Sequence, residues 1–324
     1  PAPQPMLRRR SLALIAVLAA AAWLLGGWFL PGPLPRDTEL AVPAGSSLTS
    51  VAATLEQKGA VSSATVFRLR ARLLGGGAPI KAGSFLLPKG ASQRTLVEIL
   101  QGGKVVRRFV TVPEGMPSIM VAERLAAQPM LTGAVSAPPE GSVLPDTYEI
   151  GPGEPRAAVV LRMQAAMQRT LKELWAKRSP NTVARTPEEA VILASIVEKE
   201  TGKPEERAMV AGLYSNRLRQ RMMLQADPTI IYPITKGKPL GRRIRQSEIA
   251  AVNGYNTYSM VGLPEGPITN PGRASIQAVL NPAQTDALYM VADGTGGHAF
   301  ASTLEEHNRN VAKWFAIRRA RGEL

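Results

Sequence analysis

The longest hydrophobic stretch of the chain is an uncharged run of twenty residues near its N-terminus, from Ser11 to Leu30. A helix of twenty residues rises roughly 30 Å, which is about the thickness of the hydrocarbon core of a bilayer. We therefore predict a transmembrane helix over residues 11–30. Its aromatic residues are expected at the outer membrane interface: Trp23, Trp28 and Phe29.

Positive charge sets the expected orientation of this helix. Three arginines, Arg8–Arg10, precede the run, and such residues stay on the cytoplasmic side. Residues 1–10 are therefore expected in the cytoplasm and the rest of the chain beyond the membrane. A cleaved signal peptide is the alternative, since Ala19–Ala22 offers small residues for cleavage. The chain begins at Pro1, and Met6 is a candidate natural start.

Hydrophobic positions recur at the same offsets in two segments, residues 40–55 and 110–125, and more weakly in a third, residues 86–100. Each segment has an extended apolar stretch, a Pro-x-Gly turn, and apolar residues spaced three and four apart. This order predicts a short strand, a tight turn and a short amphipathic helix. Such units resemble LysM-type modules, which hold N-acetylated glycan chains; packing units without a ligand are the alternative. We assign residues 31–108 to a linker and this LysM-like region.

The spacing of apolar residues predicts further helices in the second half of the chain. Amphipathic patterns cover residues 154–177 and 185–202, and a third helix is expected from Pro204 to near Met223. Residues 224–232 are predicted as a loop that leads into a strand-like stretch. Residues 287–302 are predicted as a hairpin around Asp-Gly.

The helix expected over residues 185–202 has clear end signals. Thr186 is a suitable N-cap, Pro187 suits the first helical position, and Glu189 completes a capping box. Gly202 is placed to end the helix.

The apolar ridge of this helix leads to an acidic residue. Glu200 lies three residues after Val197, four after Ile196 and seven after Leu193, so it continues the ridge, whereas Glu198 lies off it. The sequence therefore places one carboxylate, Glu200, on the face that is expected to be buried.

A carboxyl group in that position loses water when it ionises, so its pKa should rise. It can then hold a proton near neutral pH, as a general acid must. A structural glutamate that pairs with Lys203 or Arg207 is the alternative.

Composition restricts the possible partners and cofactors. Lys and Arg number 39 against 25 Asp and Glu, a net charge of +14, which suits nucleic acid, anionic lipid or an acidic polymer. The predicted membrane span makes nucleic acid the least favoured of these. The absence of cysteine excludes a thiolate metal site, and the only two histidines, His298 and His307, leave almost nothing for a histidine-built metal centre.

Two predicted loops carry amide, hydroxyl and aromatic groups, which bind neutral sugars by hydrogen bonds and stacking. Residues 224–232 contribute Gln225, Asp227 and Thr229. The loop at 254–272 contains two tyrosines, two asparagines, three prolines and four glycines. Structural turns have similar compositions, so these loops alone do not establish a sugar site.

Four motifs in order, ASIVEKET, LQADPTIIY, YNTYSMVGLPEGPITNPG and VADGTGGHAF, resemble those of the MltG/YceG-like endolytic murein lytic transglycosylases. The resemblance covers nearly the whole chain. It implies an α+β fold with an N-terminal transmembrane helix, a LysM-like region, and a mixed α+β catalytic domain over residues 109–324. Departures occur at Ser142–Leu144, where relatives tend to have aromatic residues, and at Glu265, where a second proline is common.

The resemblance also implies a site and a reaction. The catalytic residue would be Glu200, the glutamate before threonine in E-K-E-T, and the substrate-binding residues would be Gln225, Asp227, Thr229, Tyr255, Asn256 and Tyr258. The implied reaction cleaves the β-1,4 bond between N-acetylmuramic acid and N-acetylglucosamine within peptidoglycan strands and leaves a 1,6-anhydro end. It would take place at the outer face of the cytoplasmic (inner) membrane, without metal or cofactor.

A non-catalytic peptidoglycan-binding scaffold of the cell-wall synthesis machinery is the alternative function. Peptidoglycan synthases and division proteins are candidate protein partners under either interpretation, and no nucleic-acid partner is expected.

Overall fold

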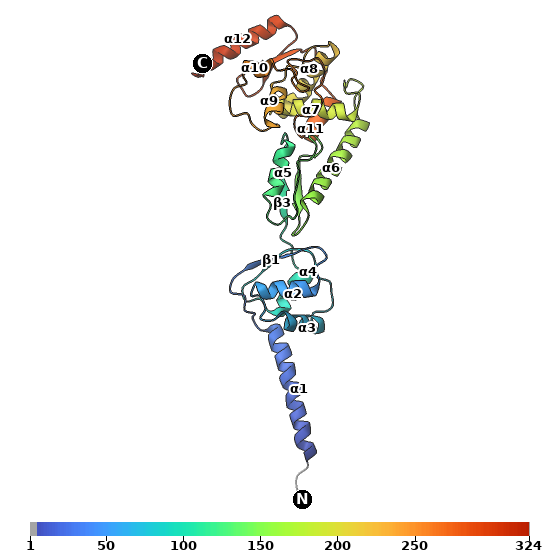
Figure 1. Ribbon diagram of the computed structural model, residues 1–324, viewed down its shortest axis with the longest axis vertical. Helices are drawn as coiled ribbons and strands as arrows, with labels where there is room; N and C mark the ends of the chain where they lie inside the picture. The colour runs from blue at the N-terminus through green and yellow to red at the C-terminus, as the bar shows by residue number, and fades with distance from the viewer. Residues whose placement is uncertain (1–4, 324) are drawn as a thin grey trace. The chain divides into compact units, whose positions relative to one another are not determined.

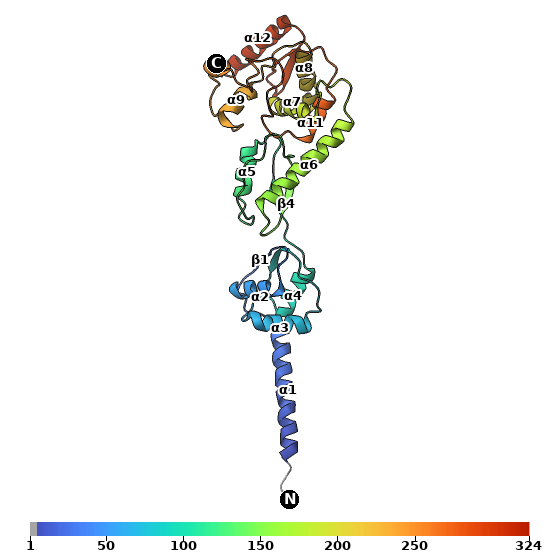
Figure 2. The same ribbon diagram turned by 45° about the vertical axis from the view of Figure 1, so that its right-hand side comes forward.

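The structure is a computed structural model that describes residues 5–323. It is a mixture of helices and short strands, as expected for an α+β fold (Figures 1 and 2). The chain divides into two compact units. Unit 1 comprises the described residues up to Phe109 together with Met130–Thr132 and Glu149–Glu154, and unit 2 comprises the remainder.

The first element of unit 1 is the helix α1, Pro5–Phe29. Its segment Leu12–Phe29 is the one helical stretch among the described residues that is long and apolar enough to cross a membrane. The predicted helix is therefore confirmed. Trp28 departs from expectation: only 4% of it is exposed, because it packs into the core of unit 1.

Beyond α1, unit 1 is built around one antiparallel strand pair. Strand β1, Thr38–Val42, pairs with β2, Gly83–Leu87, in the register Thr38↔Leu87 to Val42↔Gly83. The helices between and after these strands are α2, Leu48–Gln57, α3, Ala64–Leu74, and α4, Gln93–Gly102. The strand pair and these helices enclose the core of unit 1. Its buried side chains include Leu40, Phe85, Leu87, Val51, Leu55, Phe67, Leu96 and Leu100.

The predicted strand–turn–helix repeats are confirmed in all three places. The segments form β1 with α2, β2 with α4, and β3, Arg108–Thr111, with α5, Ser118–Ala126. Each Pro-x-Gly turn needs a glycine because its φ is positive: 79° at Gly45, 65° at Gly90 and 71° at Gly115. Strand β3 pairs with β4, Thr147–Ile150.

Unit 2 is arranged around α7, Pro187–Glu200, whose neighbours are α6, α8, α9 and α11 (Figure 1). The remaining elements are α6 Arg156–Ala176, the short 3₁₀ helix η1 Pro204–Glu206, α8 Arg207–Arg219, α9 Asp227–Thr235, α10 Gln246–Ile249, α11 Arg273–Leu280, β5 Tyr289–Ala292, β6 His298–Ala301 and α12 Leu304–Ala320. Strands β5 and β6 pair antiparallel, which confirms the predicted hairpin.

The predicted start of α7 is confirmed, and its predicted end is wrong. The Thr186 hydroxyl accepts a hydrogen bond from Glu189 N at 3.2 Å, while the Glu189 carboxylate accepts one from Arg185 N. The helix ends at Glu200 with Thr201 in an extended conformation, so Gly202 does not form the C-cap. The helix α8 ends at Arg219, earlier than predicted.

The prediction of residues 224–232 as a loop that leads into a strand-like stretch is also wrong, because α9 begins at Asp227. Pro228 lies in the first helical turn, where its fixed φ is favourable. The β-branched residues resemble a strand in sequence, but burial of Thr229, Ile230 and Tyr232 on one helical face outweighs that local preference.

Candidate active site

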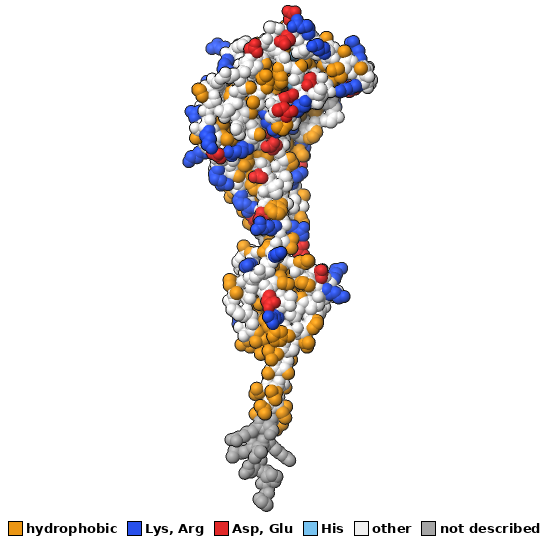
Figure 3. Space-filling model, turned by 180° about the vertical axis from the view of Figure 1, so that it is seen from behind, with side chains coloured by type: hydrophobic (Ala, Val, Ile, Leu, Met, Phe, Trp, Pro, Cys, Tyr) orange, Lys and Arg blue, Asp and Glu red, His pale blue; other side chains and the backbone are white. Residues whose placement is uncertain are grey.

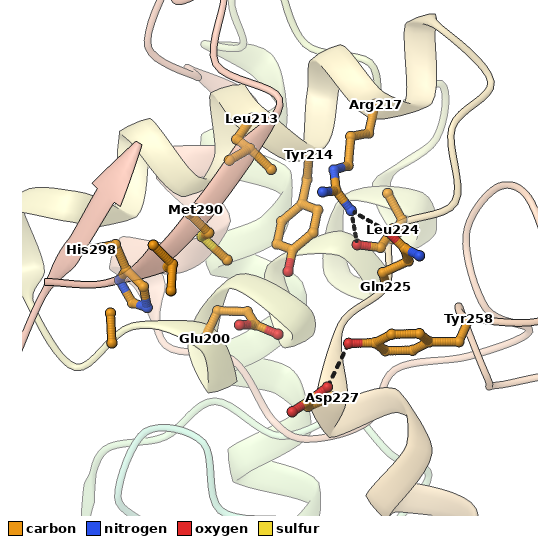
Figure 4. Close-up of a pocket in the computed structure, with 12 residues that line it drawn as sticks. Glu200, Leu213, Tyr214, Arg217, Leu224, Gln225, Asp227, Tyr258, Met290 and His298 are labelled. Atoms are coloured by element: carbon orange, nitrogen blue, oxygen red, sulfur yellow. Dashed lines mark hydrogen bonds between the residues drawn. The ribbon is translucent and has the colours of Figure 1, made fainter. Parts of the chain in front are cut away.

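A cavity of about 230 Å³ opens in unit 2 where the end of α7 meets α8, the start of α9 and the β5–β6 hairpin (Figure 4). Its wall combines acidic, amide, hydroxyl and apolar groups. The lining residues are Glu200, Leu213, Tyr214, Arg217, Leu224, Gln225, Asp227, Tyr258, Met290, Val291, Ala292 and His298.

Glu200 reaches this cavity because it is the last residue of α7. The ridge that leads to it, Leu193, Ile196 and Val197, is fully buried, as the spacing predicts. The residue as a whole is partly exposed, but its Oε1 is shielded from solvent and has no hydrogen-bond partner among residues 5–323.

Burial and, to a lesser extent, the nearby Asp227 carboxylate raise the pKa of Glu200 to about 7. The facing Tyr214 hydroxyl and the Arg217 guanidinium act in the opposite direction. The carboxyl group can therefore carry a proton at neutral pH.

The expectation that Glu200 alone faces inward is wrong. The side chain of Glu198 is only 5% exposed. It accepts a hydrogen bond from Gly272 N at 2.8 Å and lies 3.8 Å from Arg207 Nη2. The helix α7 is buried almost all round, so its periodicity does not separate these two carboxylates. Their partners do.

Tyr214 and Arg217 of α8 form the wall opposite Glu200, and the sequence analysis did not identify them. Figure 4 shows the Tyr214 hydroxyl and the Glu200 carboxyl pointing into the same space. Arg217 donates to Leu288 O at 2.7 Å and to Leu224 O at 2.8 Å, which fixes its guanidinium. The signal was present: Tyr214 and Arg217 follow Val210 on the apolar face of α8, where an arginine is unusual.

Three of the predicted substrate-binding residues line the cavity with Glu200. Gln225 has a left-handed backbone, with φ of 54°, and its side-chain oxygen accepts a hydrogen bond from Arg217 at 3.3 Å. Asp227 accepts a 2.6 Å hydrogen bond from the Tyr258 hydroxyl. Burial and this carboxylate together raise the pKa of Tyr258. The 254–272 loop thereby contributes a side chain to the same wall as α9.

The other three predicted binding residues, Thr229, Tyr255 and Asn256, do not line this cavity. Thr229 is buried, and its hydroxyl bonds to Ala226 O. Asn256 is buried and donates to Ile249 O at 2.9 Å, while its own oxygen accepts from Tyr258 N at 3.0 Å.

These contacts show that Asn256 shapes the loop that carries Tyr258. Tyr255 packs its ring against Tyr232, with centroids 4.8 Å apart. A direct role in binding substrate stays a prediction for all three of these residues.

His298 is a further cavity residue that the sequence analysis did not assign. Its Nδ1 lies 2.8 Å from Glu206 Oε2, and its backbone N–H donates to Glu206 Oε1 at 2.9 Å. Burial alone would raise the pKa of Glu206, but hydrogen bonds from His298 and Thr201 hold it below its usual value. Glu206 therefore fixes the orientation of the histidine ring at the edge of the cavity.

The groups that line the cavity are suited to acid–base chemistry on a polymer that carries hydroxyl and amide groups. Among residues 5–323, no three His, Asp or Glu side chains are grouped so as to hold a metal ion. The Gln225 amide, two tyrosine hydroxyls and the Asp227 carboxylate share this cavity with the Glu200 carboxyl group. Such an arrangement can orient a sugar and give a proton to its glycosidic oxygen.

The sequence matches the YceG-like family over residues 40–313. The chain belongs to this family. It is 30% identical to an endolytic murein transglycosylase of Streptococcus pneumoniae serotype 2, strain D39, over 93% of its own length. It spans 64% of that relative, just under two thirds.

Two further relatives agree over most of both chains. The endolytic murein transglycosylase of Bacillus subtilis strain 168 is 26% identical, with 90% of this chain and 91% of that protein covered. The crystal structure of a yceG-like protein from Listeria monocytogenes is similar with a TM-score of 0.54 and 26% identity. That likeness covers 85% of this chain and 98% of the solved one.

Proposed function

We propose that the protein is a membrane-anchored endolytic lytic transglycosylase that cleaves peptidoglycan strands. Membership of the YceG-like family and relatives named endolytic murein transglycosylases support the activity. The observation that carries the proposal is the Glu200 carboxyl group at the wall of an open cavity. One of its oxygens is shielded and has no hydrogen-bond partner within residues 5–323.

In the proposed reaction Glu200 acts first as acid and then as base. Its proton goes to the glycosidic oxygen between N-acetylmuramic acid and N-acetylglucosamine as the bond from that oxygen to muramoyl C1 breaks. The C6 hydroxyl of the same muramoyl unit attacks C1, and its proton passes to Glu200. A 1,6-anhydro ring forms, no water is consumed, and the acid is regenerated. The attack is efficient because the nucleophile is already attached to the reacting sugar.

The neighbouring groups suit a supporting role in this reaction. The Tyr214 hydroxyl lies where it can bond the ionised form of Glu200, and Arg217 adds positive charge nearby. Gln225 and the Asp227–Tyr258 pair offer exposed amide and carboxylate oxygens for sugar hydroxyls and N-acetyl groups. Thr229 and Asn256 would act indirectly by holding the segments that carry these groups.

The helix α1 and the rest of unit 1 fit the same proposal. The apolar segment Leu12–Phe29 would anchor the protein in the cytoplasmic membrane, with the catalytic part on the outer side. The LysM-like region would hold a glycan strand. A second cavity of about 440 Å³ in unit 1, with Leu48, Phe67 and Gln101 among its lining residues, offers apolar and amide groups for this.

The test is the chemistry of the product ends. Digestion of purified peptidoglycan by the full chain should release fragments with 1,6-anhydro-muramoyl ends, identified by mass spectrometry. The Glu200→Gln variant should bind peptidoglycan and leave it intact. Glu188→Gln is the matched control, because Glu188 is an exposed glutamate of the same helix, and this variant should digest normally.

Pulldown of peptidoglycan by the wild-type chain without any digestion would instead support the non-catalytic scaffold. Normal digestion by Glu200→Gln would overturn the catalytic assignment.

One observation favours a second candidate, a hydrolase that uses water. Asp227 places another carboxylate in the same cavity as Glu200, and glycoside hydrolysis uses two carboxyl groups on opposite sides of the bond. Products with reducing ends, formed by the wild-type chain and lost in Asp227→Asn, would establish this candidate. Anhydro ends formed by both proteins would exclude it.

A further inference from the structure

The end of α1 is part of the core of unit 1 and is not a loose tether. Trp28 is buried among the side chains of unit 1, and so is Leu34 just beyond the helix. The backbone that follows is bonded to the β2–α4 turn, with Gly32 N donating to Gly90 O at 3.1 Å and Gly90 N to Leu34 O at 2.9 Å. These contacts set the orientation of α1 within unit 1.

The helix α3 is joined to α1 through Arg70. Its Nη2 donates to Trp23 O at 2.7 Å, and its guanidinium lies over the Trp23 ring at 4.5 Å from the centroid. A Cβ at Gly27 would overlap this guanidinium, so the close approach depends on the glycine. Figures 1 and 2 both show α3 beside the end of α1.

The contact between Arg70 and Trp23 shows where α3 lies along the axis of α1. Trp23 lies six residues before Phe29, the last residue of α1, which corresponds to about 9 Å along the helix axis. An anchor that spans the membrane up to Phe29 would therefore hold α3 at the depth of the headgroup layer. Helices of peripheral membrane proteins bury their apolar faces about 5–10 Å into this layer.

The outward face of α3 has the composition that such a position requires. Leu69 is 47% exposed and Leu73 is 61% exposed, and the two lie one helical turn apart on a face next to Arg70. Arg72 is exposed beside them and forms no ion pair with any residue the structure describes, so its charge is available to anionic headgroups. Figure 3 shows hydrophobic side chains gathered at the end of unit 1 from which α1 emerges.

We propose that α3 is a second membrane contact, an interfacial helix whose leucines Leu69 and Leu73 enter the lipid surface and seat unit 1 on the bilayer. The inference rests on the proposed anchoring of α1. It adds a lipid-binding surface outside the span and implies that unit 1 does not pivot freely on its anchor.

The chain has no cysteine, so a single spin label can be placed at will. We choose Leu73→Cys for α3, Leu18→Cys for the exposed surface of α1, and Leu86→Cys as the matched control. Leu86 is another leucine, 54% exposed, on strand β2 of the β1–β2 pair, and it belongs to neither α1 nor α3. Each labelled full-length chain is reconstituted into vesicles that contain anionic phospholipid.

Collision with oxygen, which concentrates in lipid, and with a water-soluble nickel chelate then reports the surroundings of each label. At Leu73 we expect several-fold less contact with nickel than at Leu86, and several-fold more contact with oxygen, so that this label approaches Leu18. Equal collision rates for the labels at Leu73 and Leu86, with the Leu18 label in lipid, would overturn the membrane contact of α3. The anchoring of α1 would still stand.

Two other outcomes also overturn the proposal and have different meanings. A label at Leu73 that neither reagent reaches is covered by protein, and broadening by a second label would identify that protein as another copy of the chain. Contact of the Leu18 label with nickel would show that α1 does not span the bilayer, and would therefore remove the anchor on which this inference rests.

Discussion

Two carboxylates near the end of α7 have opposite surroundings. Glu198 receives a backbone N–H from Gly272 and lies near Arg207, so its charge is compensated. Glu200 is two residues further on, at a cavity wall, and its Oε1 has no partner among the described residues 5–323. Burial alone therefore does not make a glutamate an acid catalyst. Burial and the Asp227 carboxylate raise the pKa of Glu200, whereas the carboxylate of Glu198 is held by Gly272 N and lies near Arg207.

The strongest test substitutes each of the two glutamates in turn and compares the effects on activity and on stability. Glu200→Gln should reduce turnover by about 10²–10⁴-fold, the range that a general acid contributes, and leave folding intact. Glu198→Gln should lower the free energy of unfolding by about 1–3 kcal/mol, because a charge-assisted hydrogen bond is lost, while the folded fraction keeps its activity. Peptidoglycan digestion and urea unfolding of each full-length variant measure both quantities. A folded but inactive Glu198→Gln would break the distinction.

The pH dependence of stability provides the next largest effect. The pKa of Glu200 is about 7 in the folded protein against 4.5 in an unfolded chain, so its contribution to stability is complete below pH 4.5 and is lost as pH rises through 7. Above pH 7 the cost approaches about 3 kcal/mol. Glu200→Gln should therefore unfold at higher urea than the wild type at pH 8 and at the same urea at pH 4.5. Equal midpoints at pH 8 would show that Glu200 ionises without penalty.

The same pKa predicts the pH profile of the reaction. Activity that requires protonated Glu200 should fall above pH 7. Asp227→Asn removes a negative charge that raises this pKa, so the alkaline limb of kcat/KM should move to lower pH. Glu205→Gln, an exposed glutamate of η1, is the control and should leave the limb in place. An unmoved limb in Asp227→Asn would show that another group sets the profile.

The smallest effect is expected at Tyr258. Its hydroxyl donates to Asp227 at 2.6 Å, so Tyr258→Phe leaves the ring in place and frees the carboxylate. We expect about a 3–10-fold loss in kcat/KM, the equivalent of one ordinary hydrogen bond. Steady-state digestion of a soluble glycan fragment measures it. No change would show that the Asp227–Tyr258 pair does not position the substrate.

The parts of the fold that depend on local patterns were predictable. The repeats followed from Pro-x-Gly turns and three-four spacing, and α7 from its cap at Thr186. The local pattern misled for α9, where β-branched Ile230 and Ile231 resemble a strand although the segment packs as a helix. Tertiary burial decides such cases, and periodicity does not report it.

The candidate site was only partly predictable for a related reason. Motifs identified Glu200, Gln225, Asp227 and Tyr258, which the fold brings to one cavity. The same motifs contain Asn256, whose amide holds the loop backbone. They omit Tyr214 and Arg217, because those residues come from α8 and meet the others only in three dimensions. His298 lies in the fourth motif, but the sequence analysis gave it no role. A polar residue in a motif can serve the loop or the substrate, and only its contacts tell which.

The hydrogen bonds of Arg217 have a consequence for how a glycan chain can enter. One guanidinium holds Leu224 O, before α9, and Leu288 O, at the base of the hairpin. Two sides of the cavity are thus held by a single side chain of α8. Moving either side away would leave the buried guanidinium of Arg217 without one of its hydrogen-bond acceptors. We therefore expect these two sides of the cavity to keep their separation when a ligand enters.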